Sequence, residues 1–106
     1  MVRAVLAEIT RRITEPFSLG VLAKAAHVSE SHLRRVFREV TGMPLGEFVR
    51  QSRVRHAQAL LARGDLRVGE IARQSGFSGP HAFSRAFKDA VGMSAKDWRK
   101  KIAPGH

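Results

Sequence analysis

Apolar residues recur along this chain at the spacing of helical turns. In the first segment Val2 is followed by apolar residues three, four, seven and eleven positions later, at Val5, Leu6, Ile9 and Ile13. Such a series lies along one side of an α-helix, where it can face a core. No run of the chain shows the strict apolar–polar alternation of a half-buried strand. The pattern therefore predicts an all-α fold.

Breaks in this pattern divide the chain into seven predicted helices. A serine hydroxyl can accept a hydrogen bond from a free backbone N–H at a helix start, and Ser18, Ser29 and Ser94 precede three of the apolar series. Glycine adopts the left-handed conformation that ends many helices, and Gly42 and Gly92 follow two of the series. The predicted helices lie at about residues 2–13, 19–26, 30–41, 44–63, 68–75, 79–91 and 94–102.

The chain contains one small unit twice. Residues 22–48 align with residues 71–98, first at an offset of 49 positions and, after one inserted residue, at an offset of 50. Each copy is a short helix, a tight turn and a longer helix, which is the layout of a helix-turn-helix motif. Two copies are too few for a solenoid, so we interpret them as a tandem pair. The matched pairs include Leu22 and Ile71, Val28 and Phe77, Leu33 and Phe83, Arg35 and Arg85, Glu39 and Asp89, Gly42 and Gly92, and Phe48 and Trp98.

The longer helix of each copy has an apolar side and a basic side. The expected buried stripes are formed by Leu33, Val36, Phe37 and Val40 in the first copy and by Phe83, Ala86, Phe87 and Ala90 in the second. The opposite faces carry our candidate DNA-binding residues, which are Ser31, Arg34, Arg35, Arg38, His81, Ser84, Arg85 and Lys88. A basic helix face is usually an ordinary solvated surface, but this one occurs twice at matched positions. That recurrence favours DNA recognition in the major groove.

The predicted fourth helix, residues 44–63, changes its apolar side along its length. Leu45 and Phe48 lie on one side near its start, whereas Val54 and Ala57 lie on roughly the opposite side further along. A helix of about twenty residues is roughly 30 Å long, close to the distance of about 34 Å between successive major grooves on one face of DNA. We therefore expect a linker helix between an N-terminal subdomain at residues 1–43 and a C-terminal subdomain at residues 64–106.

The charge balance points to a polyanionic partner. The 106 residues include 19 Lys and Arg against 9 Asp and Glu, a formal net charge of +10 at pH 7. Nucleic acid and an anionic membrane surface are the two candidate partners for such an excess. The apolar runs are too short to span a membrane, and the predicted bundle uses every apolar stripe, so we expect no membrane association.

The residues give no sign of catalysis or of a bound cofactor. The chain has no cysteine and no glycine-rich phosphate loop, and its five histidines are scattered. We therefore expect no enzyme, no cofactor and no metal site, and a cytoplasmic location. The favoured function is a sequence-specific, double-stranded DNA-binding regulator. The alternative is a basic protein that binds nucleoid DNA or RNA without sequence preference.

Two segments resemble the DNA-binding domain of the AraC/XylS family of bacterial transcription regulators. They are "RVRHAQALL", Arg53 to Leu61, and "IARQSGFSGPHAFSRAFKDAVGMSAKDWR", Ile71 to Arg99. The resemblance extends over most of the chain. It implies seven helices, two helix-turn-helix motifs, a long linker helix, binding to asymmetric promoter DNA and activation through RNA polymerase. We expect the effector or dimerisation domain that many members carry to be absent from these 106 residues.

The resemblance also assigns base-reading positions to both longer helices. They fall on Ser31, Arg34 and Arg35 in the first helix and on Pro80, His81, Ala82 and Arg85 in the second. Pro80 and Ala82 offer no side chain that can hydrogen-bond to a base edge. We therefore expect the first helix to carry most of the sequence discrimination.

Overall fold

A computed structural model describes residues 1–103, so His106 lies outside the described residues. This part of the chain contains helices and no strand. The helices are α1 (Val2–Arg12), α2 (Leu19–Ala25), α3 (Glu30–Thr41), α4 (Leu45–Arg63), α5 (Val68–Gln74), α6 (Pro80–Val91) and α7 (Ala95–Ile102). The predicted all-α fold with seven helices is therefore confirmed over the described range.

Local capping explains where several helices begin and end. The hydroxyls of Ser18, Ser29 and Ser94 each accept a hydrogen bond from the backbone N–H three residues later, at 3.4, 3.1 and 3.1 Å. Each bond satisfies one of the N–H groups that a helix start leaves without an intrahelical partner. Gly42 and Gly92 end α3 and α6 with φ of 77° and 90°. All five residues therefore act as the sequence predicted.

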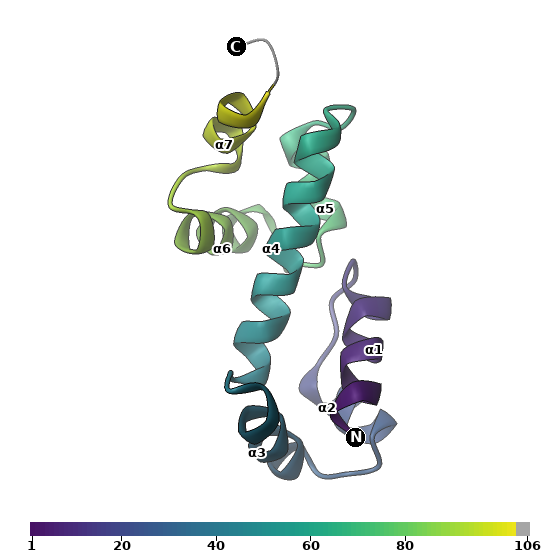
Figure 1. The fold of residues 1–106 in the computed structure, drawn as a ribbon. Coiled ribbons are helices and arrows are strands. Elements are labelled where there is room, and N and C mark those ends of the chain that lie inside the picture. The colour runs from purple at the N-terminus through teal and green to yellow at the C-terminus, as the bar shows by residue number, and fades with distance from the viewer. Residues whose placement is uncertain (104–106) are drawn as a thin grey trace.

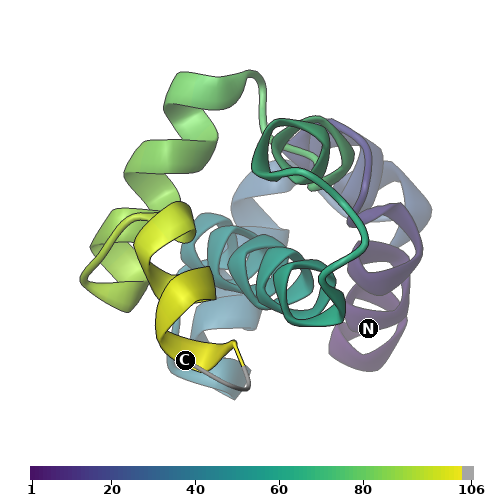
Figure 2. The same cartoon turned by 90° about the horizontal axis from the view of Figure 1, so that it is seen from above.

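Two hydrophobic cores lie at the two ends of α4, and among residues 1–103 no buried side chain belongs to both. The first core joins α1–α3 to the start of α4, and the second joins α5–α7 to its later turns (Figure 1). The described molecule is accordingly elongated, measuring 49 × 23 × 22 Å. Seen from above, α4 runs through the middle, with α1 on one side and α6 and α7 on the other (Figure 2).

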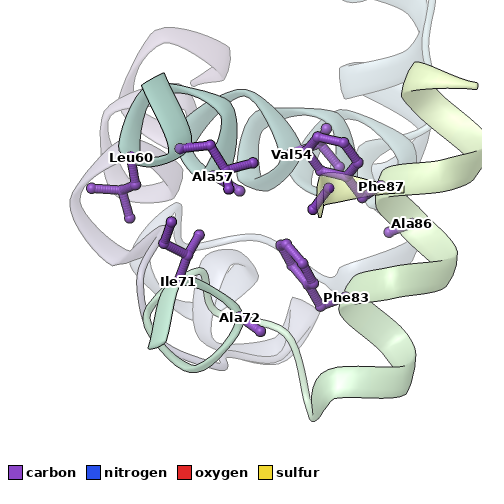
Figure 3. Packing of buried hydrophobic residues seen from close by; sticks show 10 residues of the cluster. Val54, Ala57, Leu60, Ile71, Ala72, Phe83, Ala86 and Phe87 are labelled. Atoms are coloured by element: carbon purple, nitrogen blue, oxygen red, sulfur yellow. The ribbon is translucent and has the colours of Figure 1, made fainter. Parts of the chain in front are cut away.

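The second core is built from side chains of α4, α5 and α6 that point toward one another (Figure 3). Val54 and Ala57 of α4 meet Ile71 of α5 and the rings of Phe83 and Phe87 of α6. Leu45 and Phe48, by contrast, belong to the first core. The change of apolar side along α4 is therefore confirmed, and this one helix packs on both cores.

The repeat extends to the aromatic packing. Phe37 and Phe48 meet edge to face, with ring centroids 5.4 Å apart and planes at 69°. Their matched residues, Phe87 and Trp98, also meet edge to face, with centroids 6.0 Å apart and planes again at 69°. Such a geometry is favourable for aromatic rings. Trp98 therefore does in the second core what Phe48 does in the first.

Two residues of the expected buried stripes are exposed. Val40 in α3 is 64% exposed, and its matched residue Ala90 in α6 is exposed as well. Both lie on the inward side of their helices, within about 20° of the buried Leu33 and Phe83. Each, however, lies in the last turn of its helix, one turn beyond the last buried residue of the stripe. The prediction that Val40 and Ala90 face the cores was wrong.

Candidate nucleic-acid interface

The exposed face of α3 carries all four of the residues predicted for the first helix-turn-helix motif. Leu33 and Phe37 anchor α3 by lying fully buried in the first core. Because they occupy the inward side of the helix, the outward side presents polar and basic groups to solvent. These exposed residues are Ser31, Arg34, Arg35 and Arg38.

The three arginines of α3 are not held alike. Arg35 lies 3.0 Å from Nδ1 of His32, through its Nη2 atom, and 3.9 Å from a carboxylate oxygen of Glu39. Both partners belong to α3, so they hold the Arg35 side chain along its own helix. The side chains of Arg34 and Arg38 make no hydrogen bond or ion pair with any other residue from 1 to 103. Their guanidinium groups remain available to an external anion.

Arg34 and Arg38 also line a groove that the sequence did not reveal. The groove has a volume of about 520 Å³ and lies between the start of α2, α3 and the first turns of α4. Its walls include Phe17, Leu19 and Leu45. The two guanidinium groups therefore lie at the edge of an apolar hollow beside the exposed face of α3.

The exposed face of α6 repeats this arrangement in the second motif. Its inward side is anchored by Phe83, Ala86 and Phe87, which are all buried in the second core. Pro80, the first residue of the helix, is exposed, while Ala82 is partly covered. The predicted residues His81, Ser84, Arg85 and Lys88 are all exposed on the outward side.

The turns within the two motifs have the same backbone conformation. The offset of 49 that relates Val28 to Phe77 also relates His27 to Gly76. These last two residues have positive φ, 59° for His27 and 83° for Gly76. The scattered distribution of histidines gave no role to His27, but its alignment with a turn glycine would have revealed one.

Helix α4 joins the two motifs and contacts each of them directly. Its 19 residues give a length of about 28 Å. From its first half, Arg50 donates a hydrogen bond of 2.6 Å to a carboxylate oxygen of Asp89 on α6. The matched acid of α3, Glu39, instead lies near Arg35 of its own helix. The carboxylate thus pairs with an arginine of its own helix in the first copy and with an arginine of α4 in the second.

At the other end of α4, an arginine of α7 binds a backbone carbonyl in the last turn of the helix. The Nε atom of Arg99 donates to the carbonyl of Leu61, at 3.2 Å. Leu61 lies in the last turn of α4, where carbonyl groups lack intrahelical partners and the helix dipole favours a cation. The contact fixes α7 against the end of α4.

The described residues offer little to competing kinds of site. Within residues 1–103 no group of three or more His, Cys, Asp or Glu side chains is arranged to hold a metal ion. No helix in the same range is both long enough and apolar enough to cross a membrane.

Comparison with known proteins identifies the family. Residues 22–101 match the family model described as a helix-turn-helix domain. The transcriptional activator RhaR of Klebsiella pneumoniae is 38% identical over 96 residues, which are 91% of this chain and 34% of that protein. RhaR of Salmonella schwarzengrund is 36% identical over 91 residues, 86% of this chain and 32% of that protein. The chain thus spans about a third of the length of these curated relatives.

Solved structures give the same result. The DNA-binding domain of the global transcriptional factor AdpA, in complex with a target DNA, has a TM-score of 0.89 and 31% identity, covering 94% of this chain and 90% of that one. The C-terminal domain of the response regulator AraT from Geobacillus stearothermophilus has a TM-score of 0.91 and 28% identity, covering 99% and 89%. The fold and both motifs define a helix-turn-helix domain. The chain belongs to the AraC/XylS family of such domains, which are DNA-binding parts of transcription regulators rather than enzymes.

Proposed function

We propose that this chain binds double-stranded promoter DNA in a sequence-specific manner and regulates transcription. In this proposal α3 and α6 enter two successive segments of the major groove. The observation that carries it is the matched pair of exposed basic faces, each on the second helix of a helix-turn-helix motif. Helix α4, about 28 Å long, lies between them.

The two faces have unequal chemistry for reading bases. Arginine can donate two hydrogen bonds to O6 and N7 of guanine, and α3 carries Arg34 and Arg35 near its start. In α6 the family's reading positions include Pro80 and Ala82, which offer no hydrogen-bonding side chain. His81 and Arg85 remain as polar groups there, and we propose that Arg85 contacts mainly phosphate. We propose that α3 supplies most of the sequence discrimination. Arg38, Ser84 and Lys88 would contact mainly phosphates, which fix the register of a protein on DNA.

The wider biological role rests on the relatives. The two RhaR proteins named above are transcriptional activators, and this chain spans only about a third of each. We propose that the chain acts as an activator in the cytoplasm, with RNA polymerase as a further partner. Its own parts would be an N-terminal helix-turn-helix subdomain at residues 1–43, a linker helix at 44–63 and a C-terminal helix-turn-helix subdomain at 64–106.

Selection of bound duplexes from a random DNA library tests this function. The expected result is one enriched, asymmetric site with two conserved segments whose centres lie about 10 base pairs apart. The affinity of the chain for that site should fall linearly with salt on logarithmic axes, with a slope of about −0.9 for each phosphate contacted. A scrambled duplex of the same length is the control, and it should bind more weakly at every salt concentration.

Two results would contradict the proposal in different ways. Equal affinity for selected and scrambled duplexes, or a preference for RNA, would favour the alternative of a non-specific basic protein. A flat salt response would exclude nucleic acid altogether, because phosphate contacts release counterions.

A further inference from the structure

Arg53 of α4 binds the end of α1 rather than a carboxylate. Its Nε donates to the carbonyl of Ile13 at 3.3 Å, and its Nη2 donates to the carbonyl of Glu15 at 2.9 Å. Its guanidinium carbon also lies 4.8 Å from the centre of the Phe17 ring. A cation at this end of α1 is favoured by the helix dipole and by the free carbonyls there. The side chain is half-buried, and this burial lowers the pKa of the Arg53 guanidinium.

The turn of the second motif presses on the same place. A Cβ atom at Gly76 would lie 2.3 Å from the carbonyl oxygen of Ile13 and 2.7 Å from Nε of Arg53. The backbone of the α5–α6 turn therefore packs directly on the first motif's side of the molecule. Figure 1 shows the end of α1 and this turn meeting beside α4. Three segments distant in sequence thus converge on one guanidinium group, and we call this contact the Arg53 junction.

The first motif shows that the turn itself does not require glycine. His27 occupies the matched position with the same left-handed backbone, and its side chain is exposed. Histidine is among the residues that tolerate this conformation. What excludes a side chain at Gly76 is therefore the contact with Ile13 and Arg53, not the backbone angle alone.

The position of the junction gives it leverage over the whole molecule. Because no side chain belongs to both cores, their relative setting depends on α4 and on the few contacts that cross between the halves. The Arg50–Asp89 pair is one such contact, but it is largely exposed, and exposed pairs hold geometry weakly. The Arg53 junction adds two hydrogen bonds and a close backbone contact.

We propose that the Arg53 junction is a positioning element that holds α3 and α6 in a fixed relative setting. This inference rests on the proposed function for its consequence, which is a fixed spacing between the two DNA segments that the chain contacts. Arg53 acts through the helices that it fixes and touches no DNA itself.

Distances between the two reading helices test the junction without DNA. Val40 and Ala90 are exposed residues at matched positions on α3 and α6. Because the chain has no native cysteine, a Val40→Cys, Ala90→Cys double variant carries nitroxide labels at these two positions and nowhere else. Pulsed electron paramagnetic resonance then gives the distribution of label distances. Arg53→Gln and Gly76→Ala should broaden or shift this distribution.

Matched controls separate the junction from general effects. Arg55→Gln removes the same charge from an exposed position of α4, and His27→Ala leaves an alanine in the same left-handed conformation as Gly76→Ala. Both controls should keep the unaltered distribution. If Arg53→Gln fails to fold, Arg53→Lys and Gly76→Ala carry the test. Unchanged distances in every folded junction variant would overturn the proposal.

A spacing series on DNA tests the consequence. The selected site is rebuilt with up to two base pairs added or removed between its two segments. Wild type should lose affinity several-fold at each altered spacing, whereas Arg53→Gln and Gly76→Ala should show a several-fold smaller loss. If all proteins retain the same strict spacing, the junction proposal fails while the proposed function stands. If wild type binds no DNA specifically, the proposed function fails, and the label distances still decide the junction.

Discussion

His27 and Gly76 occupy the same position in the two turns and share a left-handed backbone, although only one of them has a side chain. The side chain of His27 extends into solvent. At Gly76 the corresponding space is filled by the carbonyl of Ile13 and the guanidinium of Arg53. Identical local geometry therefore tolerates different substitutions, because different neighbours surround it.

Separate substitutions of His27 and Gly76 should have different effects on the free energy of unfolding. His27→Gly relieves left-handed strain but adds freedom to the unfolded chain, so we expect between no change and a gain of about 1 kcal/mol in the free energy of unfolding. Gly76→Ala inserts a methyl group into a filled space and should lower it by about 1–3 kcal/mol. Urea unfolding monitored by circular dichroism measures both. Equal effects at the two positions would contradict the contacts described for Gly76.

Removal of the matched rings of Phe37 and Phe87 should destabilise different halves of the molecule. Both are fully buried, so Phe37→Ala and Phe87→Ala should each lower the free energy of unfolding by about 3–5 kcal/mol. Since the cores share no side chain, hydrogen exchange should accelerate first in α1–α3 for Phe37→Ala and in α5–α7 for Phe87→Ala. Uniform acceleration in all seven helices would mean that α4 couples the cores completely.

Arg35 and Arg85 allow a matched test of which motif reads sequence. Arg35→Ala should weaken binding to the selected site by roughly 1–3 kcal/mol and relax the preference at one base pair. Arg85→Ala should weaken all duplexes alike and reduce the salt slope by about one unit. Titration of both variants with selected and scrambled duplexes measures the difference. If only Arg85→Ala erased a base preference, the roles of the two motifs would be reversed.

Insertion of about five base pairs between the two segments of the selected site turns the second segment to the opposite face of the DNA. A chain whose motifs are joined through one continuous α4 cannot follow that rotation. Affinity should therefore fall toward that of a site with a single segment, as measured by gel mobility shift. An insertion of about ten base pairs, which restores the face but doubles the separation, is the control and should be no better tolerated.

Much of the fold followed from local signals in the sequence. Ser29 and Gly42 delimit α3 through contacts within four residues, so composition and spacing were sufficient. The repeat gave a second signal. It paired Trp98 with Phe48 and so indicated that both rings have the same packing role. The exposure of Val40 could not be predicted in this way. Periodicity gives the angle of a residue around its helix, but it does not show how far the neighbouring helices extend.

Other parts of the site had no local signal. Arg53 reaches a carbonyl 40 residues earlier in the chain, and backbone carbonyls are present at every position. Nothing in the pattern therefore distinguishes this arginine from the exposed Arg55 two residues later. The same holds for Arg50 and Asp89, whose 39-residue separation hides their contact. Long-range polar contacts of this kind depend on how the helices pack.

The absence of a shared side chain between the cores also bears on how such a chain evolves. A substitution on α3 affects the packing of the first core, and one on α6 affects that of the second. Each half can therefore acquire a new DNA preference without disturbing the other half. The two copies already differ in this way, because Arg34 on the outward face of α3 is matched by Ser84 on that of α6. The repeat thus gives the chain two halves that can vary independently. The common inheritance that both must retain is α4 and the small surface against which it holds them.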